Sequence, residues 1–143
     1  MKTNNIDKIY NESNNIDEFV SGYFENLKNI INQLDIGSIS GFIEEFSDSY
    51  EHNQTIFVAG NGGSSSTAST MANDIGFDIM KKTGDSKPLK IHALTENSSV
   101  ITAIANDTGY ENIFLNQLKI HYKQGDKLLV ISASGNSNNL ILA

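Results

Sequence analysis

Two segments of the chain combine glycine, asparagine and serine directly after short apolar runs: GNGGSSS at positions 60–66 and SASGNSNN at positions 132–139. Glycine lets a ligand approach the backbone closely, and serine hydroxyls add hydrogen-bond donors without bulk. A helix that begins in such a segment offers unpaired N–H groups and the positive end of its dipole, which favour an anion such as phosphate. One such loop alone is more typical of a turn with a helix cap, but two in equivalent positions predict phosphate binding.

The hydroxyls of the second segment are the candidate phosphate ligands. Ser132, Ser134 and Ser137 are spaced so that three short donors can surround the oxygens of one phosphate. The backbone supplies the positive field, so no arginine is required, and the sequence contains none. The first segment matches neither nucleotide fingerprint: it is not G-x-x-x-x-G-K-S/T, nor G-x-G-x-x-G with an acidic residue about 20 positions further on.

The sequence has no cysteine, which excludes a disulfide scaffold, a thiolate nucleophile and a cysteine metal site. Its three histidines, His52, His92 and His121, follow no zinc-ligand spacing. We interpret His92 as a packed histidine inside a strand and His121 as a helix-end residue, where positive charge is favourable. The residues alone therefore predict no metal site.

The composition is that of an ordinary globular domain, with 143 residues, 38% of them hydrophobic and 19% charged. Ten lysines face 17 acidic residues, which gives a formal net charge of −7. Nucleic acid and anionic membrane are therefore poor partners. We expect a cytoplasmic protein, because the sequence shows no apolar signal core at its start and no apolar run long enough to cross a bilayer.

Apolar periodicity predicts the helices that precede the two loops. Residues 1–16 are polar and unpatterned, and we expect a mobile tail there. Two amphipathic helices follow within residues 17–52, with apolar side chains at helical spacing over 19–34 and 36–50. Stripes this broad must be buried, either against the domain that follows or against a second chain.

From residue 55 onwards, predicted strands and helices alternate. We expect strands at 55–59, 89–94 and 127–132, and helices at 64–81, 99–106 and 113–122. This alternation predicts an α/β fold with a parallel sheet. Ligands of such sheets bind at the carboxyl ends of the strands, which is where both glycine and serine loops lie.

The segments GNGGSSS, TAIANDTGYENIF and GDKLLVISASGNSNN, together with the two preceding helices, resemble the sugar isomerase (SIS) domain family in its phosphoheptose isomerase branch. The resemblance covers residues 17–143. It implies a flavodoxin-like three-layer sandwich with five parallel strands, of which three are present here, so the chain looks truncated at its C-terminus. It also implies a homotetramer built partly through the N-terminal helices.

The same resemblance implies a sugar phosphate as substrate. Ser132, Ser134 and Ser137 would hold its phosphate, and the residues expected to line the sugar are Asn61, Gly62, Gly63, Ser64 and Asn97. The implied reaction is a ketose–aldose isomerisation. It interconverts sedoheptulose 7-phosphate and D-glycero-D-manno-heptose 7-phosphate on the way to heptose-containing cell-surface polysaccharide.

Two positions depart from the family pattern on the helix after GNGGS. Where the family usually has a zinc-binding histidine and a proton-transferring glutamate, this sequence has Thr70 and Asp74. Their i, i+4 spacing keeps both on one face, and Asp74 is the candidate catalytic base, although a solvated helix aspartate explains it equally well. Zinc is implied only by the resemblance, and Thr70 is a poor substitute for histidine as its ligand. The family's second acid/base histidine lies in a late helix that would follow Ala143.

Two hypotheses remain open for the function. The first is a phosphoheptose isomerase that uses Asp74 as its base. The second is a non-catalytic SIS module that binds a phosphosugar and acts as a regulator or scaffold. An inactive remnant with an incomplete sheet is a third, weaker interpretation.

Overall fold

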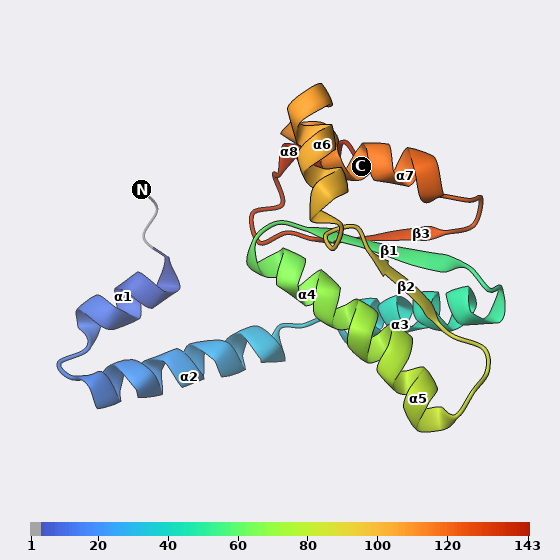
Figure 1. Cartoon of the computed structure of the whole chain (residues 1–143). Helices are drawn as coiled ribbons and strands as arrows, with labels where there is room; N and C mark the ends of the chain where they lie inside the picture. The colour runs from blue at the N-terminus through green and yellow to red at the C-terminus, as the bar shows by residue number, and fades with distance from the viewer. Residues whose placement is uncertain (1–3) are drawn as a thin grey trace. The chain divides into compact units, whose positions relative to one another are not determined.

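The structure is a computed structural model that describes residues 4–143, and the chain divides into two compact units between Phe42 and Ile43. The first unit contains α1 (Asn5–Glu12), α2 (Ile16–Asn32) and the beginning of α3 (Ile36–Glu51). The second unit contains the remainder of α3 and the whole sheet with its helices (Figure 1).

A helix occupies much of the segment where we expected a mobile tail over residues 1–16. The side chain of Asn4 caps this helix, α1, by accepting a hydrogen bond from the N–H of Asp7 at 2.8 Å. The ring of Tyr10 packs edge-on against Phe19 of α2, with centroids 5.5 Å apart. The tail prediction is therefore wrong for residues 5–12, because a packing partner on α2 stabilises a helix that is too short to persist alone. Residues 1–3 lie outside the described part of the chain.

Both amphipathic helices that the sequence predicts are present, as α2 and α3. Asn15 caps α2 by accepting the N–H of Glu18 at 2.9 Å, and Glu18 in turn accepts the N–H of Asn14 at 2.8 Å. That second bond is the main cause that lowers the pKa of the Glu18 carboxyl. The apolar stripe of α2 is exposed in the single chain, at Val20, Tyr23, Phe24, Leu27, Ile30 and Ile31.

The second unit is built on a parallel three-stranded sheet in the order β2-β1-β3. Its strands are β1 (Thr55–Gly60), β2 (Lys90–Ala93) and β3 (Lys127–Ile131). The central strand, β1, is buried from Ile56 to Gly60 because helices cover both faces of the sheet. A strand buried on both faces needs a continuous apolar sequence, which is what TIFVA provides.

Helices cover the sheet on two sides (Figure 1). On one side lie α4 (Gly63–Met71), a π-helical segment (Ala72–Asp78) and α5 (Ile79–Thr83), and Phe46 of α3 packs on the same core as Val58 and Ala68. The other side carries α6 (Ser98–Thr108), a 3-10 turn (Tyr110–Asn112), α7 (Ile113–His121) and α8 (Asn138–Ile141). There Phe57 of β1 packs with Phe114 of α7. The α/β class, the three layers and the parallel sheet are confirmed.

The helix expected over residues 64–81 is not one regular α-helix. Seven residues in its middle, Ala72–Asp78, are π-helical, and α5 extends the helix to Thr83. Gly76 in the π-helical segment is buried, and a Cβ there would lie 3.6 Å from both the Leu89 carbonyl oxygen and Ile91. Apolar periodicity does not distinguish a π-turn from an α-turn over so short a stretch. π-helical segments are rare and frequently mark functional positions.

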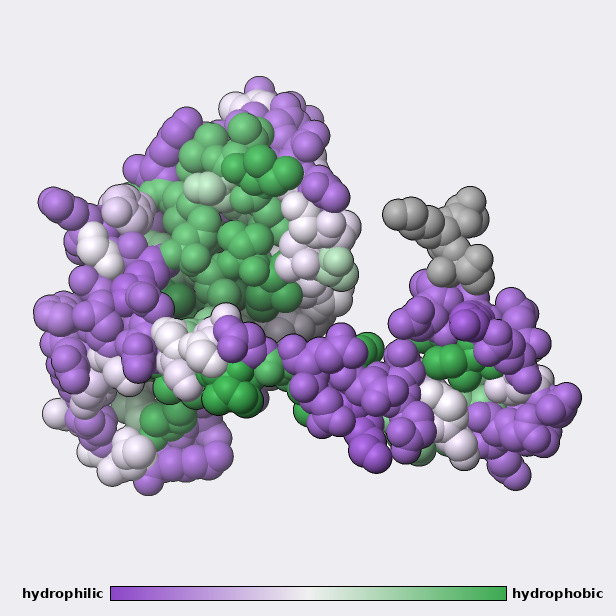
Figure 2. All heavy atoms as spheres, turned by 180° about the vertical axis from the view of Figure 1, so that it is seen from behind, coloured by the Kyte–Doolittle hydropathy of each residue, from purple (hydrophilic) through white to green (hydrophobic). Residues whose placement is uncertain are grey.

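Part of the apolar surface of the second unit is open in the single chain. Figure 2 shows a broad apolar area on this unit when it is seen from behind. β3 is an edge strand of the sheet, and Val130 on it is 39% exposed, with Ile141 and Leu142 near the end of the chain also exposed. Within residues 4–143, no helix combines the length and the apolar character needed to span a bilayer.

Candidate functional site

The carboxyl ends of the three strands bring the sequence-predicted loops to one edge of the sheet. β1 and β3 are neighbours, and Gly60 at the end of β1 is in register with Ile131 at the end of β3. The loop after Gly60 and the loop that begins at Ser132 therefore start side by side. A Cβ on Gly60 would lie 2.8 Å from the backbone of Ser64, so only glycine allows the chain to turn directly into α4.

The first loop leaves the N-terminus of α4 open. Gly62 occupies the N-cap position with φ of 55°, a left-handed conformation that favours glycine, and no side chain caps the helix. The N–H of Ser64 donates to the Asn61 carbonyl at 3.0 Å. Gly62 and Gly63 are exposed, and a Cβ at either would meet no atom within 4 Å. A ligand can therefore approach the bare backbone of this helix end.

The second loop is shaped by its own hydroxyls. Ser132 Oγ accepts the N–H of Gly135 at 3.1 Å, and Ser134 Oγ accepts the N–H of Asn136 at 3.3 Å. Each serine thus folds the loop through its oxygen and keeps its O–H as a donor. Ser137 is the N-cap of α8, but its side chain makes no cap hydrogen bond. Three serine hydroxyls therefore remain able to donate to an anion.

Side-chain amides join the two loops across the sheet edge. Asn61 Nδ2 donates to Asn139 Oδ1, and Asn139 Nδ2 donates to Asn61 Oδ1, both at 2.9 Å. The phenol of Tyr110 also donates to Asn61 Oδ1, at 3.0 Å. A site role is predicted for Asn61 and none for Asn139 or Tyr110. Both lie within the motif segments quoted above, but a sequence pattern does not reveal a contact between residues so far apart.

The loop after β2, which contains the predicted site residue Asn97, reaches the same edge. Asn97 is the N-cap of α6 and accepts the N–H of Val100 at 3.1 Å, so its amide N–H groups remain available. Thr95 lies beside α4, with its hydroxyl 3.4 Å from that of Ser69. A cavity of about 160 Å³ at this edge is lined by Asn61, Gly62, Thr95 and Tyr110 among others.

The two departures from the family pattern lie further along the helix that starts at Gly63. Thr70 and Asp74 are both exposed, and Asp74 falls in the π-helical segment. Asp74 Oδ1 accepts a hydrogen bond from Asn73 Nδ2 at 2.8 Å. At about 1.5 Å per residue, Asp74 lies roughly 16 Å along the helix from Gly63. The structure thus brings the two predicted loops together and keeps the candidate base at a distance from the start of this helix.

Similar proteins and structures identify the family of this chain. Residues 22–143 match the SIS domain. The chain belongs to the SIS domain family. It is 39% identical over 108 residues to the phosphoheptose isomerase of Clostridium acetobutylicum, a match that covers 76% of this chain and 54% of that protein. It is 40% identical over 108 residues to the probable phosphoheptose isomerase of Thermoplasma acidophilum, with 76% and 58% covered.

Solved structures of two SIS relatives have the same fold. The phosphoheptose isomerase GmhA from Neisseria gonorrhoeae superposes with a TM-score of 0.72 at 28% identity, covering 90% of this chain and 66% of that one. A phosphoheptose isomerase from Francisella tularensis gives a TM-score of 0.76 at 27% identity, covering 86% and 64%. The chain spans little more than half the length of the curated relatives it matches.

The described residues of this SIS domain do not fit a zinc site. Within residues 4–143, no three side chains of His, Cys, Asp or Glu come together so that they could hold a metal ion. Thr70 presents a neutral hydroxyl where the family pattern has an imidazole, and a structural or catalytic zinc needs three or more such ligands. Asp74 is therefore a candidate acid/base group that would act without a metal.

His92 and His121 come together at the other end of the SIS sheet. The ring of His92 packs edge-on against Phe57, with centroids 5.5 Å apart, and lies 5.7 Å from the ring of His121. Desolvation of its ring, followed by the charge of His121, lowers the pKa of His92. His92 contacts Phe57, but the residue is exposed, so the prediction of a packed histidine is wrong: β2 is an edge strand that leaves this side chain open to water. Its pairing with His121 has no sequence signal.

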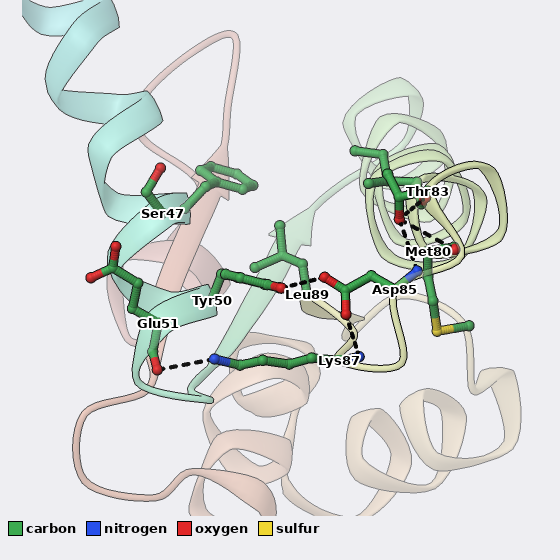
Figure 3. A pocket seen from close by; sticks show the side chains of 10 residues that line it. Ser47, Tyr50, Glu51, Met80, Thr83, Asp85, Lys87 and Leu89 are labelled. Carbon is green, nitrogen blue, oxygen red and sulfur yellow. Dashed lines mark hydrogen bonds between the residues drawn. The ribbon is translucent and has the colours of Figure 1, made fainter.

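A larger pocket of about 420 Å³ lies near the amino ends of β1 and β2, away from the predicted site residues (Figure 3). Its polar groups bind one another. Tyr50 donates to Asp85, whose other carboxylate oxygen accepts the N–H of Lys87 at 2.9 Å. The Lys87 ammonium donates to the Glu51 carbonyl at 3.1 Å and lies 4.5 Å from the centroid of the Tyr50 ring. The bond to Asp85 raises the pKa of Tyr50, and the same bond lowers the pKa of Asp85. This network fastens α3 to the segment before β2.

Proposed function

We propose that this SIS domain binds a sugar phosphate, with the phosphate at the loop Ser132–Ser137. The observation that supports this most is the pairing of two bare loops at one sheet edge: the open N-terminus of α4 and the serine loop, which start from Gly60 and Ile131 in register. Ser132, Ser134 and Ser137 supply hydroxyl donors to the phosphate oxygens. The sugar then lies along Asn61, Gly62, Gly63 and Ser64, with Asn97 beside its hydroxyls.

The substrate we propose is sedoheptulose 7-phosphate, which the protein isomerises to D-glycero-D-manno-heptose 7-phosphate. The names of its relatives at about 40% identity support this choice. The reaction occurs at the first two carbons, while the phosphate is on the seventh. A catalytic group must therefore act at the end of the sugar opposite the phosphate. Asp74 is our candidate because it stands where the family has its glutamate.

In the proposed reaction the Asp74 carboxylate removes a proton from C1 of the ketose. The C1–H bond breaks, the C2 carbonyl oxygen gains a proton, and an enediol forms. The C1 hydroxyl then loses its proton as the C1 carbonyl forms, and a proton is returned to C2. The sum is an internal redox exchange between two carbons, so no external oxidant or reductant is needed. Aspartate is shorter than the family's glutamate, and proton transfer depends on reach.

The departure at Thr70 and Asp74 also supports a second candidate, a non-catalytic SIS module that binds a phosphosugar as a regulator or scaffold. Asp74 is exposed, and one of its oxygens is bonded to Asn73. An exposed carboxylate with one such bond is equally typical of a solvated helix residue that has no catalytic role. The two candidates share the binding site and differ only in turnover.

An assay of the protein with sedoheptulose 7-phosphate separates the candidates. We expect aldose formation in the wild type, and we expect Asp74→Asn to lower kcat by about 100-fold or more while sugar phosphate binding by calorimetry is retained. Asp78→Asn is the matched control, because Asp78 is one turn further on and pairs with Lys82. Binding without turnover in the wild type would favour the non-catalytic module, and equal kcat for Asp74→Asn and wild type would remove Asp74 as the base.

We further propose that the protein works as a cytoplasmic homotetramer assembled partly through its N-terminal helices. The exposed apolar side chains of α2 support this proposal, because an apolar stripe of that size on a helix is ordinarily buried against a partner.

A further inference from the structure

The amide pair between Asn61 and Asn139 links segments that are 78 residues apart in sequence. Asn61 follows β1, and Asn139 lies in the first turn of α8, directly after the serine loop. Asn139 is 3% exposed, so its amide has been removed from water and depends on this pairing. Tyr110 adds its phenol O–H from the turn before α7 and is itself 57% exposed.

The hydrogen bonds of the Asn61 side chain can be counted atom by atom. An amide oxygen accepts two hydrogen bonds, and Asn61 Oδ1 already accepts one from Asn139 Nδ2 and one from the Tyr110 phenol. An amide nitrogen donates two, and Asn61 Nδ2 gives one to Asn139 Oδ1. One N–H of Asn61 therefore remains for a ligand, and no acceptor remains. Asn61 and Tyr110 both line the 160 Å³ cavity at this edge.

We propose that Asn139 and Tyr110 are positioning residues that hold Asn61 as a donor-only group in the sugar site. This inference rests on the proposed function. In this arrangement Asn61 accepts no hydrogen bond from the substrate and donates to one of its oxygens. The site thereby selects an oxygen with a free lone pair opposite Asn61, and it rejects an analogue with an ammonium or amide N–H at that position. The same bonds keep the sugar loop in place beside the phosphate loop.

Tyr110→Phe is the informative variant, because it removes the hydrogen bond and leaves the exposed ring. We expect Tyr110→Phe to weaken binding of sedoheptulose 7-phosphate about fivefold, with KM rising accordingly, because Asn61 Oδ1 is then held by Asn139 alone and presents one unpaired acceptor position to the ligand oxygens. Binding of inorganic phosphate, which reports on the serine loop alone, and the Tm should both be unchanged. Tyr122→Phe is the matched control, since Tyr122 is 54% exposed and its phenol makes no hydrogen bond in the described chain.

Asn139→Asp tests the other partner of Asn61. The carboxylate still accepts from Asn61 Nδ2 but donates nothing to Asn61 Oδ1, so we expect a larger loss of sugar phosphate affinity, about 20-fold. Asn138→Asp, one residue earlier and exposed, adds the same charge without touching Asn61 and serves as its control.

The outcomes separate this inference from the proposed function. If the wild type binds the sugar phosphate, and both Tyr110→Phe and Asn139→Asp bind it as their controls do, the positioning role is overturned and the function stands. If the wild type binds no sugar phosphate, the function fails, and with it the donor-only role. The part of the inference that concerns structure, namely that the Asn61–Asn139 hydrogen bonds hold the two loops together, is then tested by a double-mutant cycle on Tm. Non-additive losses for Asn61→Ala and Asn139→Ala support it, and additive losses overturn it.

Discussion

Ser132 and Ser134 each accept a backbone N–H within their own loop and keep the hydroxyl hydrogen for a ligand. The proposed phosphate site would therefore need no arginine, because the serine hydroxyls and the backbone supply its donors. The backbone bonds fix the loop before the ligand arrives, so little ordering is needed on binding. Gly135, with φ of 66°, allows the loop to return its N–H to Ser132.

Replacement of one of these serines should weaken phosphate binding. We expect Ser134→Ala to lower affinity for the sugar phosphate about tenfold, because it removes one donor to a charged group as well as the bond that holds Asn136. Calorimetric titration measures this loss. Ser86→Ala, at an exposed position in the turn before β2, should bind like the wild type. An unchanged affinity in Ser134→Ala would exclude this serine as a phosphate ligand.

Among the elements, α3 is held against the sheet by ion pairs as well as by apolar packing. The Lys127 ammonium at the start of β3 bonds to Asp48 at 2.6 Å and also pairs with Glu45, both on the part of α3 that belongs to the second unit. The hydrogen bond from Lys127 is the first cause that lowers the pKa of the Asp48 carboxyl below its ordinary value of 3.8. His52, 2.9 Å from the other Asp48 oxygen, acts in the same direction.

This shift predicts how stability depends on pH. A carboxyl whose pKa is lowered in the folded state stabilises the fold above its unfolded pKa, and that contribution is lost as the pH falls through the folded pKa. We therefore expect the Tm of the wild type to fall more steeply below about pH 4 than the Tm of Lys127→Met, in which the shift is reduced. Thermal unfolding between pH 6 and pH 3 measures the difference. Lys123→Met, which removes a lysine that makes no ion pair in the described chain, should follow the wild-type curve. Parallel curves for Lys127→Met and wild type would show that the pair adds nothing.

For the whole molecule, the exposed apolar stripe of α2 favours association of the chain with a partner in solution. Phe24 is 61% exposed and Ile31 is 56% exposed. Surfaces of this kind are ordinarily buried against partners. A homotetramer built through this helix would remove the stripe from water.

Acidic substitutions on this stripe should dissociate the proposed homotetramer. We expect the double variant Phe24→Glu, Ile31→Glu to sediment as a smaller species than the wild type at micromolar concentration, because an acidic group costs too much to bury in an apolar interface. Asn29→Glu carries the same kind of charge on the opposite face of α2 and should leave the assembly intact. Sedimentation velocity distinguishes the two. A wild type that is already monomeric would contradict the proposed tetramer directly.

The local elements and the chemistry that they carry can be predicted from the amino-acid sequence. TIFVA predicts a buried strand and KLLVIS a further strand, and the observed strands begin at the predicted residues 55 and 127. The glycines and serines that follow them predict bare loops at the carboxyl edge of a parallel sheet, which is where the structure has them. These features depend on neighbouring residues, so a linear pattern contains them.

Which of these groups contact one another depends on how distant parts of the chain pack together. The bond between Asn61 and Asn139 joins residues 78 positions apart, and the helix at Asn5–Glu12 depends on Phe19 for its packing. The π-helical turn around Asp74 is likewise absent from the periodicity, because Gly76 packs against Leu89 and Ile91 from another part of the chain. Contacts of this kind arise when separate elements pack together, and no spacing within one element encodes them.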